Sequence, residues 1–185
     1  MIVACNAFFV AAEFALVKVR LSQLEVEIRN GKRGAKLIRH ILENLNHYLS
    51  GIQLGITLTS LLLGWVGEPA IAHSLEKFLF SLGLEIPEAL LHTFSFGIAL
   101  FAISLFHIVL GEQIPKLIAI RHPMEVSYVI ARPLRIFQVV GYPFIWVFDG
   151  LTKTIMRFFR IEETQNNELH SEEEIKLLLT ESEEG

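Results

Sequence analysis

An uncharged apolar run is the feature that most restricts the fold of this chain. Residues 89–110 are 22 consecutive positions without Asp, Glu, Lys or Arg. A bilayer core about 30 Å thick is crossed by about 20 apolar helical residues. Two more stretches, 1–17 and 49–66, are nearly as long and contain one charge, that of Glu13. The pattern predicts an all-α integral membrane protein. Its three predicted spans cover about residues 1–20, 48–66 and 89–118.

The distribution of basic residues predicts the orientation. The connection after the first span carries seven basic residues: Lys18, Arg20, Arg29, Lys32, Arg33, Lys36 and Arg39. Seven more follow the third span: Lys116, Arg121, Arg132, Arg135, Lys153, Arg157 and Arg160. Residues 67–88, between the second and third spans, contain a single basic residue, Lys77. The positive-inside rule therefore places the N-terminus outside and the C-terminus in the cytoplasm, in a multi-pass protein of the cell (inner) membrane. Because the basic residues follow the stretch 1–17, it does not have the pattern of a secretory signal.

The connections also have readable patterns. Residues 17–47 are expected to be cytoplasmic helix, broken at Asn30-Gly31. Residues 70–84 either lie on the outer surface or prolong the second span beyond a bend at Gly67-Glu68-Pro69. The single Cys5 leaves no intramolecular disulfide to form.

Residues 124–160 allow two interpretations. The stretch 136–148 is apolar, but Gly141-Tyr142-Pro143 interrupts it. A fourth span would also move three basic residues outside, against the positive-inside rule. The pattern therefore favours a broken pair of juxtamembrane helices on the cytoplasmic side. Irregular backbone at Pro143 requires cover by protein or water, so this proline has a structural role.

The chain is thus divided into a membrane domain, residues 1–160, and an acidic linker, residues 161–185. Nine of the 20 acidic residues lie in the linker. Ser171 and Glu174 form a capping box before an apolar run, which predicts a short acidic cytosolic helix. That helix has too little apolar surface to fold alone, so we expect a further module after it.

Each span carries polar groups. In the first, Asn6 and Glu13 are two turns apart and share a helix face. The alternative is that Asn6 lies at the outer interface and Glu13 pairs with Lys18 or Arg20. In the second span, hydroxyl groups are offered by Thr57, Thr59 and Ser60. Such small residues also serve helix packing, together with glycines at 51, 55 and 64.

The third span ends in the segment Gly111-Glu112-Gln113-Ile114-Pro115-Lys116. Pro115 has no N–H, so the Gly111 carbonyl four residues earlier loses its helical partner. A free carbonyl beside Glu112 gives two oxygen groups at one place, which suits a hard cation. The alternative is that Pro115 only ends a helix and Glu112 pairs with Lys116.

The remaining polar residues exclude several kinds of site. His92 and His107 are 15 residues apart, without a carboxylate at helical spacing, and we expect them to be structural. The sequence contains no HExxH, paired Cys, P-loop or GxSxG motif, and we expect no enzymatic activity. Amide, hydroxyl, carbonyl and carboxylate oxygens suit Mg²⁺ or Ca²⁺ better than Zn²⁺ or Cu⁺.

Three motifs, in this order, carry a resemblance to a known family. They are NAFFVAAEFAL at residues 6–16, GIQLGITL at residues 51–58 and GEQIPK at residues 111–116. Together with Tyr142-Pro143 and the acidic helix at residues 172–175, they make the chain resemble the transmembrane domain of the CNNM/CorC family. The resemblance implies a Mg²⁺ transporter, generally an exporter that exchanges Mg²⁺ for Na⁺. It also implies a homodimer with three membrane helices and a juxtamembrane helix per subunit. In such proteins a cytosolic pair of CBS domains that binds adenine nucleotide follows the acidic segment, and the present chain ends before it.

The resemblance assigns the predicted site residues. Gly111, Glu112 and Pro115 match the family's third-helix motif directly. Asn6 stands where relatives carry Ser or Thr, and Glu13 stands where bacterial relatives often carry Glu. Two positions depart from the pattern, because Val10 replaces a frequent Ser and Ile56 a frequent Asn. The hydroxyls of Thr57, Thr59 or Ser60 can then take over as ligands.

We therefore expect a membrane-embedded Mg²⁺ transporter with no nucleic-acid partner. The expected metal ligands are Asn6, Glu13, Thr57, Thr59, Ser60, Gly111 and Glu112. The alternative function is a membrane-embedded sensor or scaffold that regulates another transporter, which the lost ligands at Val10 and Ile56 would favour. A transporter of organic ions is less consistent with the few charged groups in the spans.

Overall fold

The computed structural model describes residues 1–81 and 88–159, and every regular element within these two ranges is a helix. The all-α prediction is confirmed for this part of the chain. The chain forms two compact units, Met1–Phe148 and Asp149–Gly185. In the described part of the second unit, helix continues to Phe158, and the Thr154 hydroxyl donates to the Gly150 carbonyl at 2.8 Å. The predicted acidic helix at residues 161–185 lies outside the described residues.

The first long helical run contains the second predicted span. It consists of α4 (Leu45–Leu62), the π-helix η1 (Leu63–Gly67) and α5 (Glu68–Ser81). Together they make an uninterrupted run of 37 residues. Of the two interpretations of residues 70–84, the structure supports a prolonged second helix as far as Ser81, and residues 82–84 lie outside the described residues. The wide turn of η1 replaces the predicted bend at Gly67-Glu68-Pro69.

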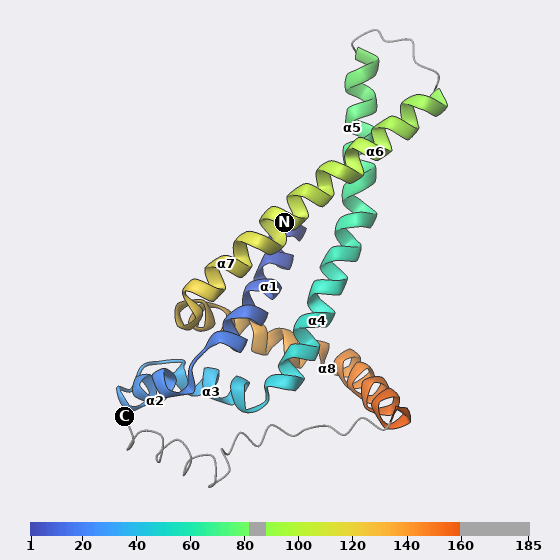
Figure 1. Ribbon diagram of the computed structural model, residues 1–185. Coiled ribbons are helices and arrows are strands. Elements are labelled where there is room, and N and C mark those ends of the chain that lie inside the picture. Colours follow the sequence, from blue (N-terminus) through green and yellow to red (C-terminus); the bar gives the residue numbers. More distant parts are fainter. Residues whose placement is uncertain (82–87, 160–185) are drawn as a thin grey trace, which may run out of the picture. The chain divides into compact units, whose positions relative to one another are not determined.

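The second long run contains the third predicted span. It is built from α6 (Glu88–Phe106), the π-helix η2 (His107–Gln113) and α7 (Ile114–Arg121). Figure 1 shows this run crossing the first one, with α5 and α6 adjacent. Both runs are long and apolar enough to cross a membrane. Their large side chains are widely exposed, as at Leu61 (66%) and Phe101 (71%). Such surfaces suit a lipid surrounding, and the chain is a membrane protein.

The first predicted span is shorter than the other two. α1 (Ile2–Lys18) has 17 residues, which makes it about 25 Å long. It is followed by α2 (Leu21–Arg29) after a bend of 91°. The described residues therefore contain two candidate spans, or three if this bent pair counts as one. The remaining long helix, α8 (Pro123–Phe158), is not among the candidate spans found in the described residues.

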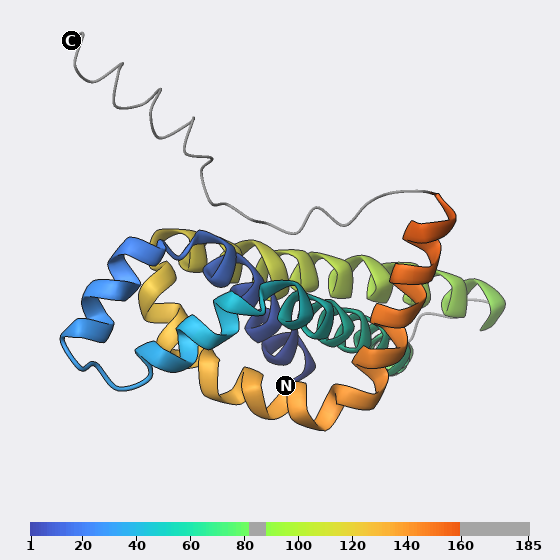
Figure 2. The same cartoon turned by 90° about the horizontal axis from the view of Figure 1, so that it is seen from below.

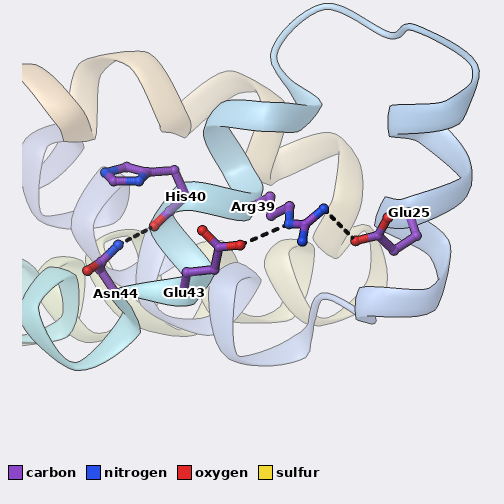
Figure 3. A network of polar contacts seen from close by, with 5 residues as sticks. All are labelled: Glu25, Arg39, His40, Glu43 and Asn44. Carbon is purple, nitrogen blue, oxygen red and sulfur yellow. Dashed lines mark hydrogen bonds and ion pairs between the residues drawn. The ribbon is translucent and has the colours of Figure 1, made fainter.

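The predicted helix break at Asn30-Gly31 is present. α2 ends at Arg29 and α3 (Ala35–Glu43) begins after a turn with two glycines in the left-handed region. Gly31 has φ 70° and Gly34 has φ 95°, conformations that glycine adopts without the steric cost of a Cβ. Figure 3 shows how the two helices are then joined: the Arg39 guanidinium of α3 contacts Glu25 of α2 at 3.1 Å, and it also pairs with Glu43 of its own helix at 2.9 Å.

The prediction of a broken pair of helices within residues 124–160 is wrong, because a single helix covers Pro123–Phe158. α8 continues through Gly141-Tyr142-Pro143 to Phe158, with Pro133 and Pro143 inside it. A proline ring fixes φ near the helical value and removes a single hydrogen bond, so a long helix can accommodate it when packing holds both sides. Two residues on, Ile145 is fully buried and supplies such packing.

The hydrophobic core lies where α1, α2, α3, α4 and α8 meet. Its buried members are Phe9, Ala12, Leu16, Leu24, Ala35, Ile38, Ile41, Tyr48, Ile52, Ile130, Ala131 and Leu134. α8 is fixed to this core by an edge-to-face ring contact of Phe137 with Phe9, at 4.7 Å between centroids, and by a 2.8 Å hydrogen bond from Gln138 Nε2 to the His47 carbonyl. Figure 2 shows α8 passing beside α1 and α4. The core thus holds the first turns of α4 against α1, upstream of the polar groups described next.

Candidate metal-binding site

A buried amide joins the three helices that carry the sequence motifs. Asn6 on α1 is 2% exposed. Its Nδ2 donates to the Gly111 carbonyl of η2 at 3.0 Å. Its Oδ1 accepts from the hydroxyl of Thr59 at 2.8 Å and from that of Ser60 at 3.4 Å, both on α4. Residues separated by up to 105 positions in sequence therefore contribute oxygens to one place. We call Asn6, Thr59, Ser60 and Gly111 the polar cluster.

The Gly111 carbonyl reaches the cluster because two local features prevent normal helical pairing. Pro115, four residues on, has no N–H to donate. The segment His107–Gln113 is also a π-helix, a form found mostly as single wide turns at functional sites. Gly111 and Pro115 are both buried. The sequence predicted the free carbonyl, and the structure adds the wide turn.

Two glycines allow the helices to approach closely enough for these contacts. A Cβ on Gly55 would lie 2.5 Å from the Phe9 ring, closer than real side chains come. A Cβ on Gly111 would lie 2.9 Å from His107 Cδ2 and 3.3 Å from Asn6 Nδ2. Gly55 therefore sets the distance between α1 and α4, and Gly111 sets the distance between α1 and η2. Small residues at helix crossings serve this purpose in membrane proteins.

Thr59 offers its hydroxyl oxygen to the cluster at little cost. Its Oγ1 also lies 2.8 Å from the Gly55 carbonyl and 3.0 Å from the Ile56 carbonyl of its own helix. A hydroxyl has one proton and two acceptor lone pairs, so the proton can turn to a backbone carbonyl while the oxygen faces another ligand. Thr59 can therefore exchange its bond to Asn6 for a cation without losing its only hydrogen bond.

His107 belongs to the surroundings of the cluster, although it is not among the predicted ligands. Its Nε2 lies 3.5 Å from Ser60 Oγ, and its side chain is partly buried. The signal available in the sequence was its position one turn before Gly111, on the same side of the third span. The other histidine of that span, His92, is exposed, as expected for a residue outside the site.

Three other predicted ligands lie outside the polar cluster. Glu13 accepts a 2.7 Å hydrogen bond from Gln53 Nε2 on α4, a partner that the sequence did not suggest. Thr57 is exposed and donates to the Gln53 carbonyl of its own helix at 2.8 Å. Glu112 directly follows Gly111 but is exposed. Lys116, considered above as its pairing partner, has its Nζ 4.6 Å from the centroid of the Phe14 ring.

The two departures from the family pattern have structural consequences. Val10 is 3% exposed, inside the packed part of α1, and Ile56 is half-buried on α4. Val10 is buried, Ile56 packs against the hydrophobic core, and neither side chain offers an oxygen. The oxygens of the cluster come instead from Asn6 and the pair Thr59 and Ser60.

The cluster is a neutral, oxygen-rich arrangement. Within residues 1–81 and 88–159, no group of three or more His, Cys, Asp or Glu side chains comes together. Amide, hydroxyl and backbone carbonyl oxygens are ligands of Mg²⁺ and Ca²⁺, and they also bind water. The negative charge nearest in sequence is that of Glu112, beside Gly111. This arrangement can bind and orient a hard cation.

Comparison with known sequences adds a family to this geometry. Residues 1–185 match the family described as the cyclin M transmembrane N-terminal domain, CNNM. The chain is 41% identical over 183 residues to the UPF0053 protein YhdT of Bacillus subtilis, covering 98% of this chain and 39% of that protein. It is 38% identical over 183 residues to the UPF0053 protein YhdP of the same organism, covering 98% and 41%.

The similarity extends beyond one group of bacteria. The UPF0053 protein sll0260 of Synechocystis is 30% identical over 179 residues, covering 97% of this chain and 39% of that protein. The chain therefore spans 39–41% of the length of these three relatives. The resemblance seen in the motifs at residues 6–16, 51–58 and 111–116 is confirmed over the whole chain.

Proposed function

The chain belongs to the cyclin M transmembrane family, the membrane domains of proteins related to Mg²⁺ transport, and from this premise we propose that it is a Mg²⁺ transporter. The observation that carries the proposal is the meeting of Asn6, Thr59 and the Gly111 carbonyl, one from each membrane helix, at hydrogen-bonding distance. Oxygen groups on separate helices can be brought together around an ion and drawn apart again. That property distinguishes a transport site from a fixed structural site.

The proposed ligands are Asn6 Oδ1, the hydroxyls of Thr59 and Ser60, and the Gly111 carbonyl. Mg²⁺ holds its water strongly and demands closely set oxygens at about 2.0–2.1 Å. In the structure the Gly111 carbonyl accepts from Asn6 Nδ2. An ion that binds both residues must displace this hydrogen bond, so the amide has to turn as the ion arrives. Ion entry and a change in the α1–η2 contact are thereby linked.

Charge for the ion is proposed to come from Glu112, which borders the cluster, with Glu13 at the Gln53 contact as a second acidic group. Neutral ligands alone stabilise a divalent ion poorly in a low-dielectric surrounding. Glu112 reaches the ion if η2 rotates when the Asn6 bond to Gly111 is released. Export with exchange for Na⁺ is the direction that fits the family, and Glu13 is the candidate Na⁺ partner.

The assembled protein is proposed to be a homodimer in the cell membrane, with the N-terminus outside and the C-terminus in the cytoplasm. The basic residues around α2, α3 and α7 support this orientation. The match covers only 39% of the relative YhdT, so that relative contains further sequence outside the match. We propose that a cytosolic CBS pair, which binds adenine nucleotide, regulates the transporter. The membrane domain itself is proposed to catalyse no chemical reaction.

One observation favours a second candidate, a membrane-embedded sensor or scaffold for another transporter. Val10 and Ile56 lack the polar groups that many relatives have, and Glu112 is exposed. A sensor needs to bind Mg²⁺ but does not need to release it on the other side of the membrane. The two candidates therefore differ in flux and not in binding.

Measuring Mg²⁺ flux into proteoliposomes distinguishes a transporter from a sensor or scaffold. The purified chain is reconstituted with a Mg²⁺-sensitive dye inside, and an inward Mg²⁺ gradient is imposed. We expect uptake by the parent protein, loss of uptake in Asn6→Ala and Glu112→Ala, and normal uptake in Cys5→Ala, because Cys5 is exposed next to Asn6. Mg²⁺ binding without flux in the parent would support the sensor. Equal flux in Asn6→Ala and the parent would contradict the proposed site.

A further inference from the structure

We propose that His107 is a nitrogen ligand of the same site, and that the site consequently accepts first-row transition ions, binding Mn²⁺ more tightly than Mg²⁺. The inference rests on the proposed function, because it concerns which divalent ions the transport site selects. It adds a ligand that the sequence motifs did not identify. It also changes the expected substrate class, from a hard cation alone to hard and borderline divalent cations.

The orientation of the imidazole is the first observation. Its Nε2 lies 3.5 Å from Ser60 Oγ. The neighbouring ring atom, Cδ2, would lie 2.9 Å from a Cβ placed on Gly111. Two adjacent atoms on one edge of the ring therefore face α4 and the Gly111 turn. The ring edge with the ligating nitrogen points toward the polar cluster and not toward lipid.

The second observation is that Ser60 connects His107 to the cluster. Ser60 Oγ is 3.4 Å from Asn6 Oδ1 and 3.5 Å from His107 Nε2. Both distances are long for hydrogen bonds that involve a hydroxyl, whose usual range ends near 3.0 Å. The Ser60 hydroxyl thus lies within 3.5 Å of both the imidazole nitrogen and the amide oxygen, without a short hydrogen bond to either. Such groups can turn to a shared ion at little cost.

The π-helix supplies the third observation. η2 begins at His107 and includes Gly111. The wider turn alters the positions of both residues relative to a regular helix, and π-turns are frequent at functional sites. The same backbone feature therefore presents the Gly111 carbonyl and the His107 ring to α1 and α4.

A ligand set of several oxygens and one imidazole nitrogen determines which divalent ions bind most tightly. Imidazole nitrogen binds first-row transition ions well, whereas Mg²⁺ prefers oxygen ligands. Mn²⁺ accepts the octahedral oxygen coordination typical of Mg²⁺, and one nitrogen added to that set favours it over Mg²⁺. Zn²⁺ sites are instead usually closed by several Cys or His ligands, and the described residues lack such a group. Ligation requires the neutral tautomer with its proton on Nδ1.

The test uses the purified chain loaded with Mn²⁺ and measured by electron spin echo envelope modulation, which detects ¹⁴N bound to the ion. We expect nitrogen modulation in the parent protein, and its loss in His107→Gln. His92→Gln is the matched control, because His92 lies on the same helical run but is exposed. This variant should keep the nitrogen signal. A purely structural His107 would give no nitrogen modulation in the parent.

Competition between ions gives the second readout. We expect His107→Gln to lower the preference for Mn²⁺ over Mg²⁺ on the order of tenfold, the scale on which a lost interaction at a metal site weakens affinity. A cooperative thermal unfolding transition of this variant without added ions shows that it is folded. Mn²⁺ binding without nitrogen modulation in the parent overturns the inference and leaves the Mg²⁺ proposal standing. Binding of neither ion overturns both. The parent measurement decides the question even if the variant does not fold.

Discussion

At the scale of single residues, Asn6 determines whether the three membrane helices can share a ligand. Its amide uses one end for η2 and the other for α4, so neither contact is independent of the other. Removing a buried partner leaves the remaining polar groups unsatisfied, at a cost of about 1–3 kcal/mol for each group. An ion that replaces the amide contacts must therefore satisfy the same atoms. This requirement makes the cluster selective for ions that bring several strong ligand bonds.

The close approach at Gly111 leads to a residue-scale prediction. Gly111→Ala places a Cβ 2.9 Å from His107 Cδ2 and 3.3 Å from Asn6 Nδ2. Overpacking of this kind costs about 1–3 kcal/mol, and the displaced groups belong to the ion site. We expect a lower thermal midpoint and weaker Mg²⁺ binding in detergent. Gly97→Ala is the matched control, because nothing lies within 4 Å of the corresponding Cβ. Equal behaviour of the two variants would contradict the assigned approach.

At the scale of helices, three side chains connect α2, the turn that follows it, and α8. Lys32 pairs with Glu27, whose carboxylate also accepts a 3.2 Å hydrogen bond from the Tyr128 hydroxyl. Lys32 Nζ lies 4.5 Å from the centroid of the Tyr128 ring. The turn that Gly31 and Gly34 permit thus brings a charge pair onto α8.

The ion pair of Glu27 with Lys32 predicts that the stability of the protein depends on pH. The hydrogen bond with Lys32 lowers the pKa of Glu27, and the same bond raises the pKa of Lys32. The contribution of Glu27 to stability is present above its unfolded pKa, about 4.3, and is lost as the pH falls through the lowered folded value. That of Lys32 is present below about 10.4 and is lost as the pH rises through the raised value.

We therefore expect Glu27→Gln to lower the thermal midpoint in detergent at pH 7 by a small amount, since the pair is exposed and screened by solvent. The difference from the parent should shrink toward zero as the pH falls below about 4. Glu43→Gln, which removes an exposed carboxylate from the Arg39 pair, is the control for loss of one charge. If the difference in thermal midpoint between Glu27→Gln and the parent stays constant from pH 7 to the acid range, the ion pair with Lys32 is not the cause of that difference.

Much of the helical arrangement followed from the sequence because it depends on local chemistry. Uncharged runs located the long helices, and Asn30-Gly31 located the break between α2 and α3. Pro115 predicted that the Gly111 carbonyl would be free. The wide turns η1 and η2 were not predicted, because a π-turn forms when packing between helices outweighs regular hydrogen bonding. The continuity of α8 through Pro143 is likewise a result of packing, at Ile145.

At the site, the positions of His107 and Glu13 likewise show that contacts between helices could not be predicted from the sequence. Helical spacing indicates which side of one helix a residue shares with its neighbours, but not which helix that side will meet. His107 was set aside because its own helix offers no carboxylate at helical spacing, whereas its neighbour in space, Ser60, lies on α4. Glu13 is predicted as a metal ligand, with a pairing to Lys18 or Arg20 as the alternative, and its observed hydrogen-bond partner is Gln53.

At the scale of the whole molecule, helix length constrains the topology. The run Leu45–Ser81 has 37 residues, which corresponds to about 55 Å, well beyond a hydrocarbon core of about 30 Å. One end must therefore project from the membrane. Because basic residues precede α4 at positions 18–39, the positive-inside rule predicts that α5 is the end that projects outside.

Labelling with a membrane-impermeant maleimide tests this orientation in intact cells, on a Cys5→Ala background. We expect Ser74→Cys on α5 to react from outside, and Lys36→Cys on α3 to react only after the membrane is opened. Both positions are exposed, so a lack of reaction reports the side of the membrane and not burial. The reverse pattern would invert the proposed topology and the direction assigned to transport.

We propose that oxygens of Asn6, Thr59, Ser60 and Gly111 bind Mg²⁺ together, and the thermal midpoint of the purified protein as a function of Mg²⁺ concentration tests this binding. A ligand at 100 times its Kd stabilises the folded state by about 2.7 kcal/mol. Thr59→Val removes a hydroxyl of the cluster at nearly constant volume, and Thr57→Val removes an exposed one on the same helix. We predict that Mg²⁺ raises the midpoint of the parent and of Thr57→Val, and raises that of Thr59→Val much less. A parent protein that does not respond to Mg²⁺, or a Thr59→Val variant that responds as the parent does, would contradict the account.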